Sequence, residues 1–464
     1  MDLTELVEAF APVQVVGEPA VEIADLAYDS RAVRPGTLFF CVPGERADGH
    51  EFAERAVEDG AVALVVAYPV GVRVPQIVVA DVREAMARMA AEFYGRPTEQ
   101  LEVAGVTGTN GKTTTTFLLH SILEAAGRKP GLLGTIESRV GSERMPAIRT
   151  TPEAIDLQRT FREMLDAGNL SAALEATSHG SEQKRLLGTR FAVLIFTNLT
   201  QDHLDFHGTM EAYFDAKRRL FVEELPPAAV NVGDPYGRRL ADELRELGGK
   251  VATFGHEEDL KPGALGIKTH LRGRFNVENI LGSIAAGRLL GIDDDTIIAG
   301  IESLEGVPGR FEAVDEGQPF TVLVDYAHTP EALENVLRAA RGLDAGRLLC
   351  VFGCGGDRDR GKRPIMGRIA GQLADVAIVT SDNPRSEEPR AIIDEIVAGA
   401  DGGLEIEPDR REAIARAIEE ARPGDVVLIA GKGHEQGQQF RDRTVPFDDR
   451  EVAREALRRL GAAA

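Results

Sequence analysis

The sequence has few cysteines, no long apolar run and no sign of a targeting segment. Cys41, Cys350 and Cys354 cannot build a disulfide framework, so we expect packing thiols in a reducing compartment. No stretch approaches the roughly 18 uninterrupted apolar residues of a membrane-spanning helix. Residues 1–5 (MDLTE) lack the basic and then apolar start of a signal peptide. The sequence therefore predicts a soluble, cytoplasmic protein without membrane insertion.

Basic residues are also in deficit, which excludes further classes of partner. The chain has 53 Lys and Arg against 75 Asp and Glu, a net charge of −22. Nonspecific binding to nucleic acid or to an anionic membrane needs a basic surface, so neither is expected. With 49 Gly and 23 Pro in 464 residues the composition is not that of a disordered or collagen-like chain, and 43% hydrophobic residues supply a sizeable core. At about 150 residues per domain, the length predicts three domains.

Apolar runs rich in Val, Ile and Leu alternate with helical patterns along the whole chain, which is typical of α/β domains with mainly parallel sheets. Pattern breaks at GRP and VPG divide the chain into expected domains 1–97, 98–308 and 309–464. The predicted strands are 61–67, 76–79, 101–106, 172–174, 191–196, 228–232, 321–325, 348–352, 376–380 and 426–430. The predicted helices include 81–94, 113–126 and 275–290. In the last domain a strand–loop–helix unit repeats four times.

Residues 105–115 (GVTGTNGKTTT) predict a phosphate-binding loop between a strand and a helix. Gly108 and Gly111 let backbone amides approach an anion. Lys112 can reach the outer phosphates of a nucleotide, and the Thr113 hydroxyl can ligate Mg²⁺. Val106 departs from the strict motif, which has glycine there. The alternative is a glycine-rich turn capped by threonines, but the position of the GKT triplet favours nucleotide binding.

Polar residues follow other predicted strands. Glu175 stands directly after one of them and is, on position alone, either a Mg²⁺ ligand or a helix-capping residue. Residues 197–208 (TNLTQDHLDFHG) follow another and include His203. A cluster of Asp and His at a strand's exit favours a metal or proton-transfer site. Lys217, in a helical stretch, is by itself best interpreted as a solvated lysine.

Taken together, these motifs resemble those of the Mur ligases of bacterial cell-wall synthesis, over almost the whole chain. The matching segments are DSR at 29–31, GTNGKTT at 108–114, TTP at 150–152, EATSHG at 175–180, TNLTQDHLDFHG at 197–208, YFDAKRRLF at 213–221, FNVEN at 275–279, PGRFE at 308–312, DYAHTP at 325–330, GCGGDRDRGKRP at 353–364, DNPR at 382–385 and GKGHE at 431–435. Ala176-Thr177 stands where Val-Ser is commoner, and NVGD at 231–234 is a looser match. The ordered set carries the resemblance, rather than any single motif.

The resemblance implies an N-terminal UDP-sugar-binding domain, a central P-loop ATPase domain and a C-terminal Rossmann-like domain that binds the amino acid. It implies ATP and Mg²⁺ as cofactors and small-molecule substrates, and we expect a monomer. The implied contacts of the UDP-sugar are Ser30, Glu45, Arg46 and Ala47. Those of the muramoyl-peptide are Thr150, Thr151, Thr177, Gln183 and Arg185. Those of ATP are Gly108, Thr109, Asn110, Gly111, Lys112, Thr113, Thr114, Asn279, Arg310 and Asp325.

The remaining implied residues belong to the metal, the amino acid and catalysis. The implied Mg²⁺ ligands are Thr113, Glu175, His203 and Lys217. The implied contacts of the amino acid are Arg358, Asp382, Asn383, Pro384, Arg385, Gly431 and Glu435. The implied catalytic residues are Lys112, Lys217 and His203. Lys217 matches a lysine that the family carries as an N-carboxylated carbamate, which turns a cation repelled by Mg²⁺ into an anionic oxygen ligand.

The function implied is that of an ATP-dependent, ADP-forming ligase. It adds meso-2,6-diaminopimelate to the D-glutamyl carboxylate of UDP-N-acetylmuramoyl-L-Ala-D-Glu through an acyl-phosphate. Arg385 decides the amino acid, because a guanidinium can bind the second carboxylate that lysine lacks. Without the family, Arg385 is best interpreted as a surface ion pair with Glu387 or Glu388. The alternative functions are a lysine-adding ligase of the same family, a folylpolyglutamate synthase-like ligase, and a nucleotide-binding switch without catalysis.

Overall fold

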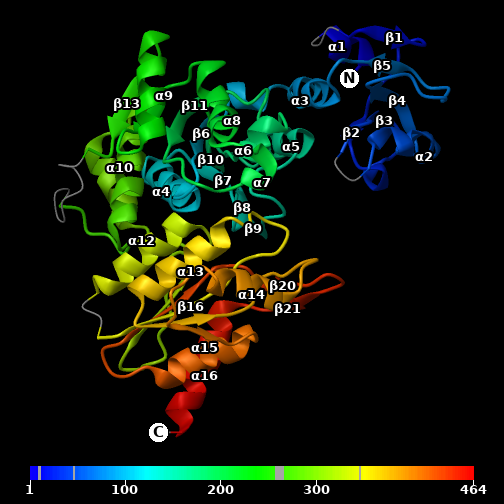
Figure 1. Ribbon diagram of the computed structural model, residues 1–464. Helices are drawn as coiled ribbons and strands as arrows, with labels where there is room; N and C mark the ends of the chain where they lie inside the picture. Colours follow the sequence, from blue (N-terminus) through cyan, green and yellow to red (C-terminus); the bar gives the residue numbers. More distant parts are fainter. Residues whose placement is uncertain (9–11, 45–46, 257–265, 344–345, 464) are drawn as a thin grey trace. The chain divides into compact units, whose positions relative to one another are not determined.

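The computed structural model of the protein describes residues 1–8, 12–44, 47–256, 266–343 and 346–463 (Figure 1). The chain forms two compact units. The first comprises Met1–Thr107, Gly127–Leu194 and Ala216–Pro227, and the second comprises Gly108–Ala126, Ile195–Asp215 and Ala228–Ala464. The expected limits of three domains at residues 97 and 308 stay a prediction.

The first unit begins with a sheet in the order β1-β5-β4-β3-β2. β1 is antiparallel to β5, and the other neighbours pair in parallel. Buried apolar side chains cover both faces, with α1 and α3 on one and α2 on the other. The elements are α1 (Leu3–Glu8), β1 (Gln14–Val16), β2 (Asp25–Ala27), β3 (Thr37–Phe40), α2 (Ala53–Glu58), β4 (Ala61–Val66), β5 (Gln76–Val78) and α3 (Val82–Phe93).

The rest of the first unit contains strands in the order β11-β6-β10-β7-β8-β9. β10 pairs in parallel with β6 and β7, whereas β8 and β9 form an antiparallel hairpin at the edge. In this register Glu175, the last residue of β10, lies opposite Val106 near the end of β6. The elements are β6 (Glu102–Thr107), β7 (Pro130–Leu133), β8 (Glu137–Val140), β9 (Glu143–Pro146), α5 (Ala154–Asp166), β10 (Ser171–Glu175) and α6 (Ser178–Glu182), with β11 (Phe191–Phe196) and α8 (Met210–Val222) divided between the units.

The second unit contains the helix that follows the predicted phosphate loop. α10 and α11 pack against this helix, α4, and β12 and β13 pair in parallel. The elements are α4 (Lys112–Ala125), α7 (Leu204–His207), β12 (Ala228–Asn231), α9 (Pro235–Glu246), β13 (Val251–Phe254), α10 (Arg274–Leu289) and α11 (Asp294–Glu302).

The C-terminal part of the second unit is a mainly parallel sheet in the order β14-β15-β19-β16-β17-β18. α12, α13 and α14 pack on one face, and α15 and α16 pack on the other (Figure 1). The elements are β14 (Glu312–Ala313), β15 (Thr321–Asp325), α12 (Pro330–Arg341), β16 (Leu348–Phe352), α13 (Lys362–Leu373), β17 (Val376–Val379), α14 (Pro389–Val397), β18 (Leu404–Ile406), α15 (Arg410–Glu420), β19 (Val426–Ala430), β20 (Gly437–Gln439), β21 (Thr444–Pro446) and α16 (Asp449–Ala463).

The predicted α/β class is confirmed, and the predicted strands are present. β11, β15, β16 and β19 have the predicted bounds, and the other predicted strands differ by one residue at one or both ends. The predicted helices 81–94, 113–126 and 275–290 correspond to α3, α4 and α10 with similar offsets. The expected repeat in the last domain is wrong after β19, because the hairpin of β20 and β21 precedes α16.

The cysteines lie in the apolar cores, as predicted for packing thiols. Cys41 and Cys350 are fully buried and Cys354 is 3% exposed. Burial raises the pKa of each thiol to about 12. The Cys354 Sγ contacts the Met366 Sδ at 3.6 Å.

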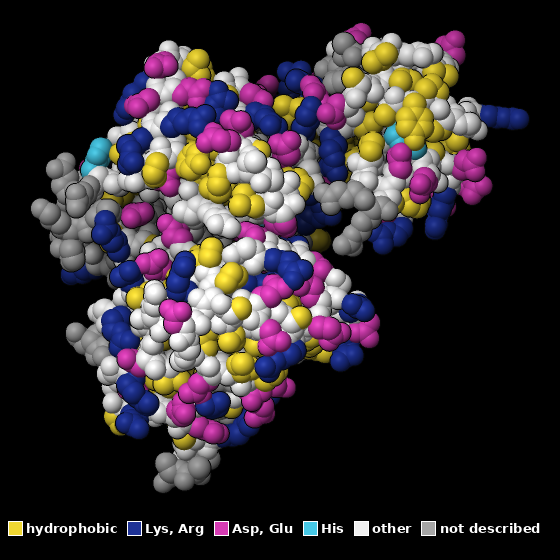
Figure 2. All heavy atoms as spheres, in the orientation of Figure 1, with side chains coloured by type: hydrophobic (Ala, Val, Ile, Leu, Met, Phe, Trp, Pro, Cys, Tyr) yellow, Lys and Arg dark blue, Asp and Glu magenta, His cyan; other side chains and the backbone are white. Residues whose placement is uncertain are grey.

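Charged residues of both signs share the surface. On the face shown in Figure 2, acidic and basic side chains are interspersed. Surface ion pairs include Arg288 with Asp294 and Arg458 with Glu316. No helix in the described residues is both long and apolar enough to cross a membrane.

An ion pair between α15 and α16 is completely buried. The Arg410 guanidinium donates to both carboxylate oxygens of Asp449, at 2.8 and 2.7 Å, and neither side chain is exposed. The same guanidinium donates to the Ala430 carbonyl at the end of β19 at 3.0 Å. This pair therefore joins both helices on one face to the central strand of the C-terminal sheet.

We expect Asp449→Ala to destabilise the protein by about 3–5 kcal/mol, because it leaves the Arg410 guanidinium buried without its counter-ion. The control is Glu316→Ala, which removes a surface ion pair with Arg458 on the same helix and should cost about 1 kcal/mol or less. Urea unfolding of both variants measures the difference. Equal losses of unfolding free energy in the two variants would contradict the stabilising role of the buried Arg410–Asp449 pair.

Candidate functional site

Residues 108–111 form a tight loop that the segment after β11 holds in place. The Thr109 amide donates to the Asn198 carbonyl and the Asn110 amide donates to the Asn198 Oδ1, both at 2.9 Å. The Thr197 hydroxyl donates to the Asn110 carbonyl at 2.7 Å. The TNLT segment, which sequence analysis treated as a separate motif, therefore sets the shape of the predicted phosphate loop.

Two positions in this loop require glycine. Gly108 has φ 148°, and a Cβ there would lie 1.8 Å from the Thr197 hydroxyl oxygen. Gly111 has φ 86°, and its Cβ would lie 2.3 Å from the Asn279 Oδ1. The structure thus brings the predicted Asn279 of α10 against the loop, where it also accepts a hydrogen bond from Thr115 at 3.3 Å.

Lys112 is the first residue of α4, at the helix end that favours an anion. Its ammonium donates to the carbonyls of Gly108 and Thr109, at 3.1 and 2.8 Å. The ammonium therefore lies over the loop itself, where the outer phosphates of a nucleotide would be expected. Thr113 and Thr114, the next residues of α4, are buried.

Arg310 and Asp325 lie beside the same helix. The Arg310 guanidinium donates to the Thr113 hydroxyl at 2.8 Å and lies over the Tyr326 ring at 4.3 Å. The buried Asp325 carboxylate accepts hydrogen bonds from the amides of Phe311 and Ala327, both at 2.7 Å. Burial raises the pKa of Asp325. Asp325 thereby fixes the segment that presents Arg310 to α4.

His203 lies next to a buried carboxylate. Its Nε2 is 3.3 Å from the Asp202 Oδ2, and His328 and Lys362 lie at 3.8 and 3.9 Å from the same carboxylate. Burial acts to raise the pKa of Asp202, but the hydrogen bond from His328 and the charges of His203 and Lys362 outweigh it and hold the pKa well below its usual range. The ionised Asp202 carboxylate therefore lies close to three basic side chains.

Glu175 ends β10 and is 1% exposed. Its Oε1 accepts from the Thr135 amide at 2.7 Å and its Oε2 from the Thr135 hydroxyl at 3.0 Å. The helix-capping alternative for Glu175 is wrong, because Thr177 caps α6 and accepts from the Gly180 amide at 3.0 Å. The carboxylate is held instead at the carboxyl edge of the first unit's sheet.

The predicted peptide-binding residues cluster around this strand end. Thr151 donates to the Glu175 carbonyl at 2.7 Å, and its hydroxyl is 2.9 Å from the Thr177 hydroxyl. Arg185 donates to the Thr151 carbonyl at 3.0 Å and to the Gln183 side chain. The hydroxyls of Thr150 and Thr135 are 3.1 Å apart.

Glu153 holds this cluster in place, and sequence analysis did not single it out. This buried carboxylate pairs with Arg185 at 3.0 Å, with Arg149 at 2.7 Å and with Arg83 of α3 at 3.1 Å. Its position directly after the TTP motif was the available signal.

Lys217, also in the first unit, lies on α8 and is 1% exposed. The interpretation of Lys217 as a solvated lysine is therefore wrong.

The expected Mg²⁺ ligands are divided between the units, with Thr113 and His203 in the second and Glu175 and Lys217 in the first. Within the described ranges, no group of three or more His, Cys, Asp or Glu side chains could hold a metal ion. The expected set is not a group of this kind, because it contains one Glu and one His beside a threonine and a modified lysine. The set stays a prediction.

The N-terminal sheet places the predicted UDP-sugar residues after neighbouring strands. Ser30 follows β2 in a short turn capped by Asp29, and the exposed Ala47 follows β3. Glu45 and Arg46 lie outside the described residues. After β4, Tyr68 stacks on the buried His50 at 4.2 Å, a pair that sequence analysis missed.

Loops after β15, β16, β17 and β19 meet at the carboxyl edge of the C-terminal sheet. Asn383 donates to the Glu435 Oε2 at 2.8 Å, and its Oδ1 accepts from Lys432 at 2.9 Å. The Gly431 amide donates to the Asp325 carbonyl at 3.0 Å. The structure therefore brings Asn383, Gly431 and Glu435 together, and the adjoining Asp382 and Pro384 are buried.

Arg385 is half-buried in the same place and has a left-handed backbone, with φ 51°. Its amide donates to the Gln439 carbonyl of β20 at 3.0 Å, and its guanidinium donates to the Gly356 carbonyl at 2.7 Å. Burial and the charge of the neighbouring Arg358 lower the pKa of Arg385. The side chains of Arg385 and Arg358 both lie beside Gly355.

The surface ion-pair interpretation of Arg385 is wrong. Glu387 pairs with Arg363 at 2.7 Å, and no carboxylate of the described residues lies within ion-pair distance of Arg385. Arg358 is exposed and donates to the Asp357 carbonyl at 2.9 Å. The edge of the sheet thus carries a partly desolvated cation that lacks an anionic partner.

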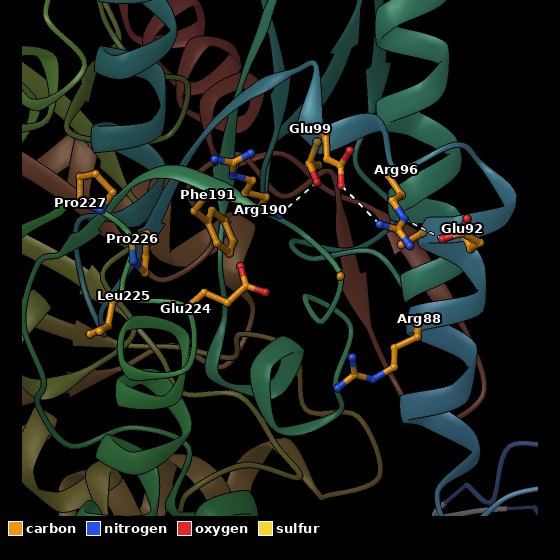
Figure 3. Close-up of a pocket in the computed structure, with 13 residues that line it drawn as sticks. Arg88, Glu92, Arg96, Glu99, Arg190, Phe191, Glu224, Leu225, Pro226 and Pro227 are labelled. Atoms are coloured by element: carbon orange, nitrogen blue, oxygen red, sulfur yellow. Dashed lines mark hydrogen bonds and ion pairs between the residues drawn. The ribbon is translucent and has the colours of Figure 1, made fainter. Parts of the chain in front are cut away.

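A separate pocket of about 520 Å³ lies within the first unit. Figure 3 shows the Arg96 guanidinium between the carboxylates of Glu92 and Glu99, with ion-pair distances of 2.6 and 3.6 Å. Phe191 and the Leu225–Pro227 segment form apolar walls. None of the predicted site residues lines this pocket.

Comparison with known proteins agrees with this arrangement. Three family models match in chain order: Mur ligase family, catalytic domain, over residues 22–94; Mur ligase middle domain over 106–262; and Mur ligase, glutamate ligase domain over 309–433. A UDP-N-acetylmuramoyl-L-alanyl-D-glutamate–2,6-diaminopimelate ligase of Geobacillus thermodenitrificans is 48% identical over 465 residues, covering 94% of this chain and 95% of that protein. The chain belongs to the Mur ligase family.

Solved structures of Mur ligases share the fold. A structure of a UDP-N-acetylmuramoyl-L-alanyl-D-glutamate–2,6-diaminopimelate ligase is 31% identical, with a TM-score of 0.68 and 99% of each chain covered. A folylpolyglutamate synthase of Mycobacterium tuberculosis matches with a TM-score of 0.62 at 17% identity, over 81% of this chain and 95% of that chain. The second likeness shows the fold alone. The family membership predicted from the motifs is confirmed.

We expect Gly108→Ala to weaken ATP binding roughly hundredfold, because the new Cβ would displace the loop from the Thr197 hydroxyl. Gly306→Ala is the matched control, since an added Cβ there meets no atom within 4 Å and the residue is exposed. Calorimetric titration of ATP with both variants measures the change. Wild-type affinity in Gly108→Ala would exclude these residues from nucleotide binding.

Proposed function

We propose that this Mur ligase joins meso-2,6-diaminopimelate to the D-glutamyl side-chain carboxylate of UDP-N-acetylmuramoyl-L-Ala-D-Glu, with conversion of ATP to ADP and phosphate. Curated relatives that are 43–48% identical carry the name of a 2,6-diaminopimelate ligase. The observation that carries the choice of amino acid is the half-buried Arg385 guanidinium without a carboxylate partner.

Diaminopimelate supplies the missing anion. Its second carboxylate can accept two parallel hydrogen bonds from the Arg385 guanidinium. Lysine has no such group and would leave this guanidinium partly buried and unpaired, which a polar site penalises far more than a missing methylene. This argues against the lysine-adding alternative. The folylpolyglutamate synthase alternative has only the fold likeness in its support.

The first chemical step activates the D-glutamyl carboxylate. A carboxylate is a poor electrophile, so its oxygen attacks the γ-phosphorus of ATP and forms an acyl-phosphate, with ADP as the leaving group. Phosphoryl transfer depends on positioning and on charge neutralisation rather than on covalent catalysis. Lys112 and the N-terminal end of α4 supply both, because the helix end favours an anion and the Lys112 ammonium lies over the loop. Asn279 borders the same loop, and Arg310 contacts Thr113 in the first turn of α4.

Mg²⁺ fits the chemistry of the expected ligands. Mg²⁺ prefers hard oxygen donors, and the Thr113 hydroxyl, the buried Glu175 carboxylate and a carbamate on Lys217 would each offer one, while the His203 imidazole would offer a nitrogen donor. When bound, the ion neutralises charge on the phosphate oxygens. Lys112 and Arg310 add positive charge from the chain itself.

The second step forms the amide. The unprotonated amine of diaminopimelate attacks the acyl carbon, and the nitrogen of the tetrahedral intermediate then loses a proton. The intermediate collapses to the amide with phosphate as the leaving group, and the proton balances as hydrogen phosphate. Arg385, Asn383 and Glu435 orient the amino acid for this attack, since they converge at one edge of the sheet. Acyl-phosphates hydrolyse readily, so the site must exclude water. A monomeric state and a cytoplasmic location remain predictions.

Arg385→Ala should lower kcat/KM for diaminopimelate by roughly a hundredfold or more, because a charge-paired contact with the second carboxylate is lost. ATP binding should be unaffected. Phosphate release with ATP, the UDP-muramoyl dipeptide and diaminopimelate or lysine measures the effect. Arg390→Ala, which removes an exposed ion pair with Asp394 on α14, is the control. Unchanged kinetics with diaminopimelate would remove Arg385 from the amino-acid site.

Lys217→Ala should be nearly inactive and should recover part of its activity when a small carboxylic acid is added, since the acid replaces the oxygens of the carbamate. The intact wild-type protein should carry the added mass of one CO₂ under non-denaturing conditions. Arg219 lies on the same helix as Lys217 and forms an exposed ion pair with Glu182 of α6, so Arg219→Ala should keep its activity. Normal activity of Lys217→Ala would contradict the proposal that Lys217 acts as a carbamate.

A further inference from the structure

Lys432 is a fully buried lysine in the loop after β19, and the proposed reaction gives it no role. None of its side-chain surface is exposed. Its ammonium donates to the Asn383 Oδ1 at 2.9 Å and to the Glu435 Oε2 at 3.1 Å. A buried ammonium is stable only with such partners. Both partners are residues that the proposed function assigns to the amino acid.

The first effect of Lys432 is on the orientation of the Asn383 amide. The Lys432 ammonium and the Gln439 amide both donate to the Asn383 Oδ1, each at 2.9 Å. Because both neighbours are donors, the oxygen must face them and the Nδ2 group must face the other way. One Nδ2 hydrogen is given to Glu435 at 2.8 Å, which leaves the second for a ligand.

The second effect is on the Glu435 carboxylate. Its Oε2 accepts from both Lys432 and Asn383, whereas its Oε1 accepts no hydrogen bond from any residue that the structure describes. The Glu435 side chain is 30% exposed, in contrast to Lys432. The carboxylate is therefore anchored through one oxygen by Lys432 and Asn383, and the other oxygen is left to accept a hydrogen bond from a ligand.

We propose that Lys432 is a positioning residue for the amino-acid substrate. It anchors Glu435 and Asn383, so that the Glu435 Oε1 accepts a hydrogen bond from a substrate ammonium and the free Nδ2 hydrogen of Asn383 meets a substrate carboxylate. Lys432 also balances the charge of Glu435, which holds this carboxylate in place before the substrate binds. This inference rests on the proposed function, since it concerns the same amino-acid site.

The test is a double-mutant cycle of Lys432→Met and Glu435→Gln, with KM for diaminopimelate as the main readout. Lys432→Met should raise this KM roughly ten- to hundredfold, as expected for loss of a hydrogen bond between charged groups. The values of kcat and of KM for ATP should change less than about threefold. In the Glu435→Gln background the same substitution should raise KM much less, because a neutral amide needs no counter-ion.

Arg347→Met is the matched control. Arg347 forms an ion pair with the buried Asp425 at 2.8 Å, at the opposite edge of the same sheet, where β16 and β19 begin. Its loss should lower the unfolding temperature without changing KM for diaminopimelate. If Lys432→Met does not fold, Lys432→Gln, which keeps one donor, replaces it in the same cycle.

The outcomes separate the two proposals. A wild-type protein that releases no phosphate with diaminopimelate overturns the proposed function itself. A wild-type protein that is active, together with a Lys432 variant whose KM for diaminopimelate is unchanged, overturns the positioning role alone. Equal increases of KM in the presence and absence of the Glu435 carboxylate would also overturn it, because Lys432 would then act without Glu435.

Discussion

Parallel pairing of the strands determines where the reactive loops can meet. In the C-terminal sheet β15, β19, β16 and β17 are neighbours and run in the same direction, so the loops after them emerge at one edge. Asn383 and Lys432 are 49 positions apart in sequence but hydrogen-bond across this edge. The N-terminal sheet applies the same constraint to the segments after β2, β3 and β4.

Each functional loop is held mainly by another loop rather than by its own residues. Asn198 and Thr197 hold residues 108–111, and Asp325 holds the segment that carries Arg310. β20 holds the backbone of Arg385. These contacts order the polar loops when the protein folds. The hydrogen-bond donors of the loops are therefore already oriented when a substrate binds. They also explain why close backbone approach, as at Gly108, leaves no room for a side chain.

Strand positions could be predicted from sequence where the strand is buried on both faces. β11, β16 and β19 are runs of Val, Leu, Ile, Phe, Ala and Cys, and their burial is nearly complete. β9 and β21 could not be predicted in this way, because they are short, polar and exposed and gain their stability from a hairpin partner.

The site was predictable as a set of motifs but not as a set of contacts. Spacing identified the phosphate loop and the DNPR quartet. It could not show that Glu387 pairs with Arg363 and leaves Arg385 without a carboxylate, or that Lys217 is buried. Spacing also did not single out Lys432, although this residue belongs to the GKGHE motif, because the burial of a side chain depends on packing from distant segments.

The thiols described among the core residues bear on the chemistry of this protein in its surroundings. A thiol whose pKa is near 12 contains almost no thiolate at neutral pH, and the thiolate is the species that reacts with electrophiles and peroxides. Cys350 and Cys354 are also shielded by the helices on their sheet. While the protein is folded, these three thiols should therefore resist oxidation and alkylation.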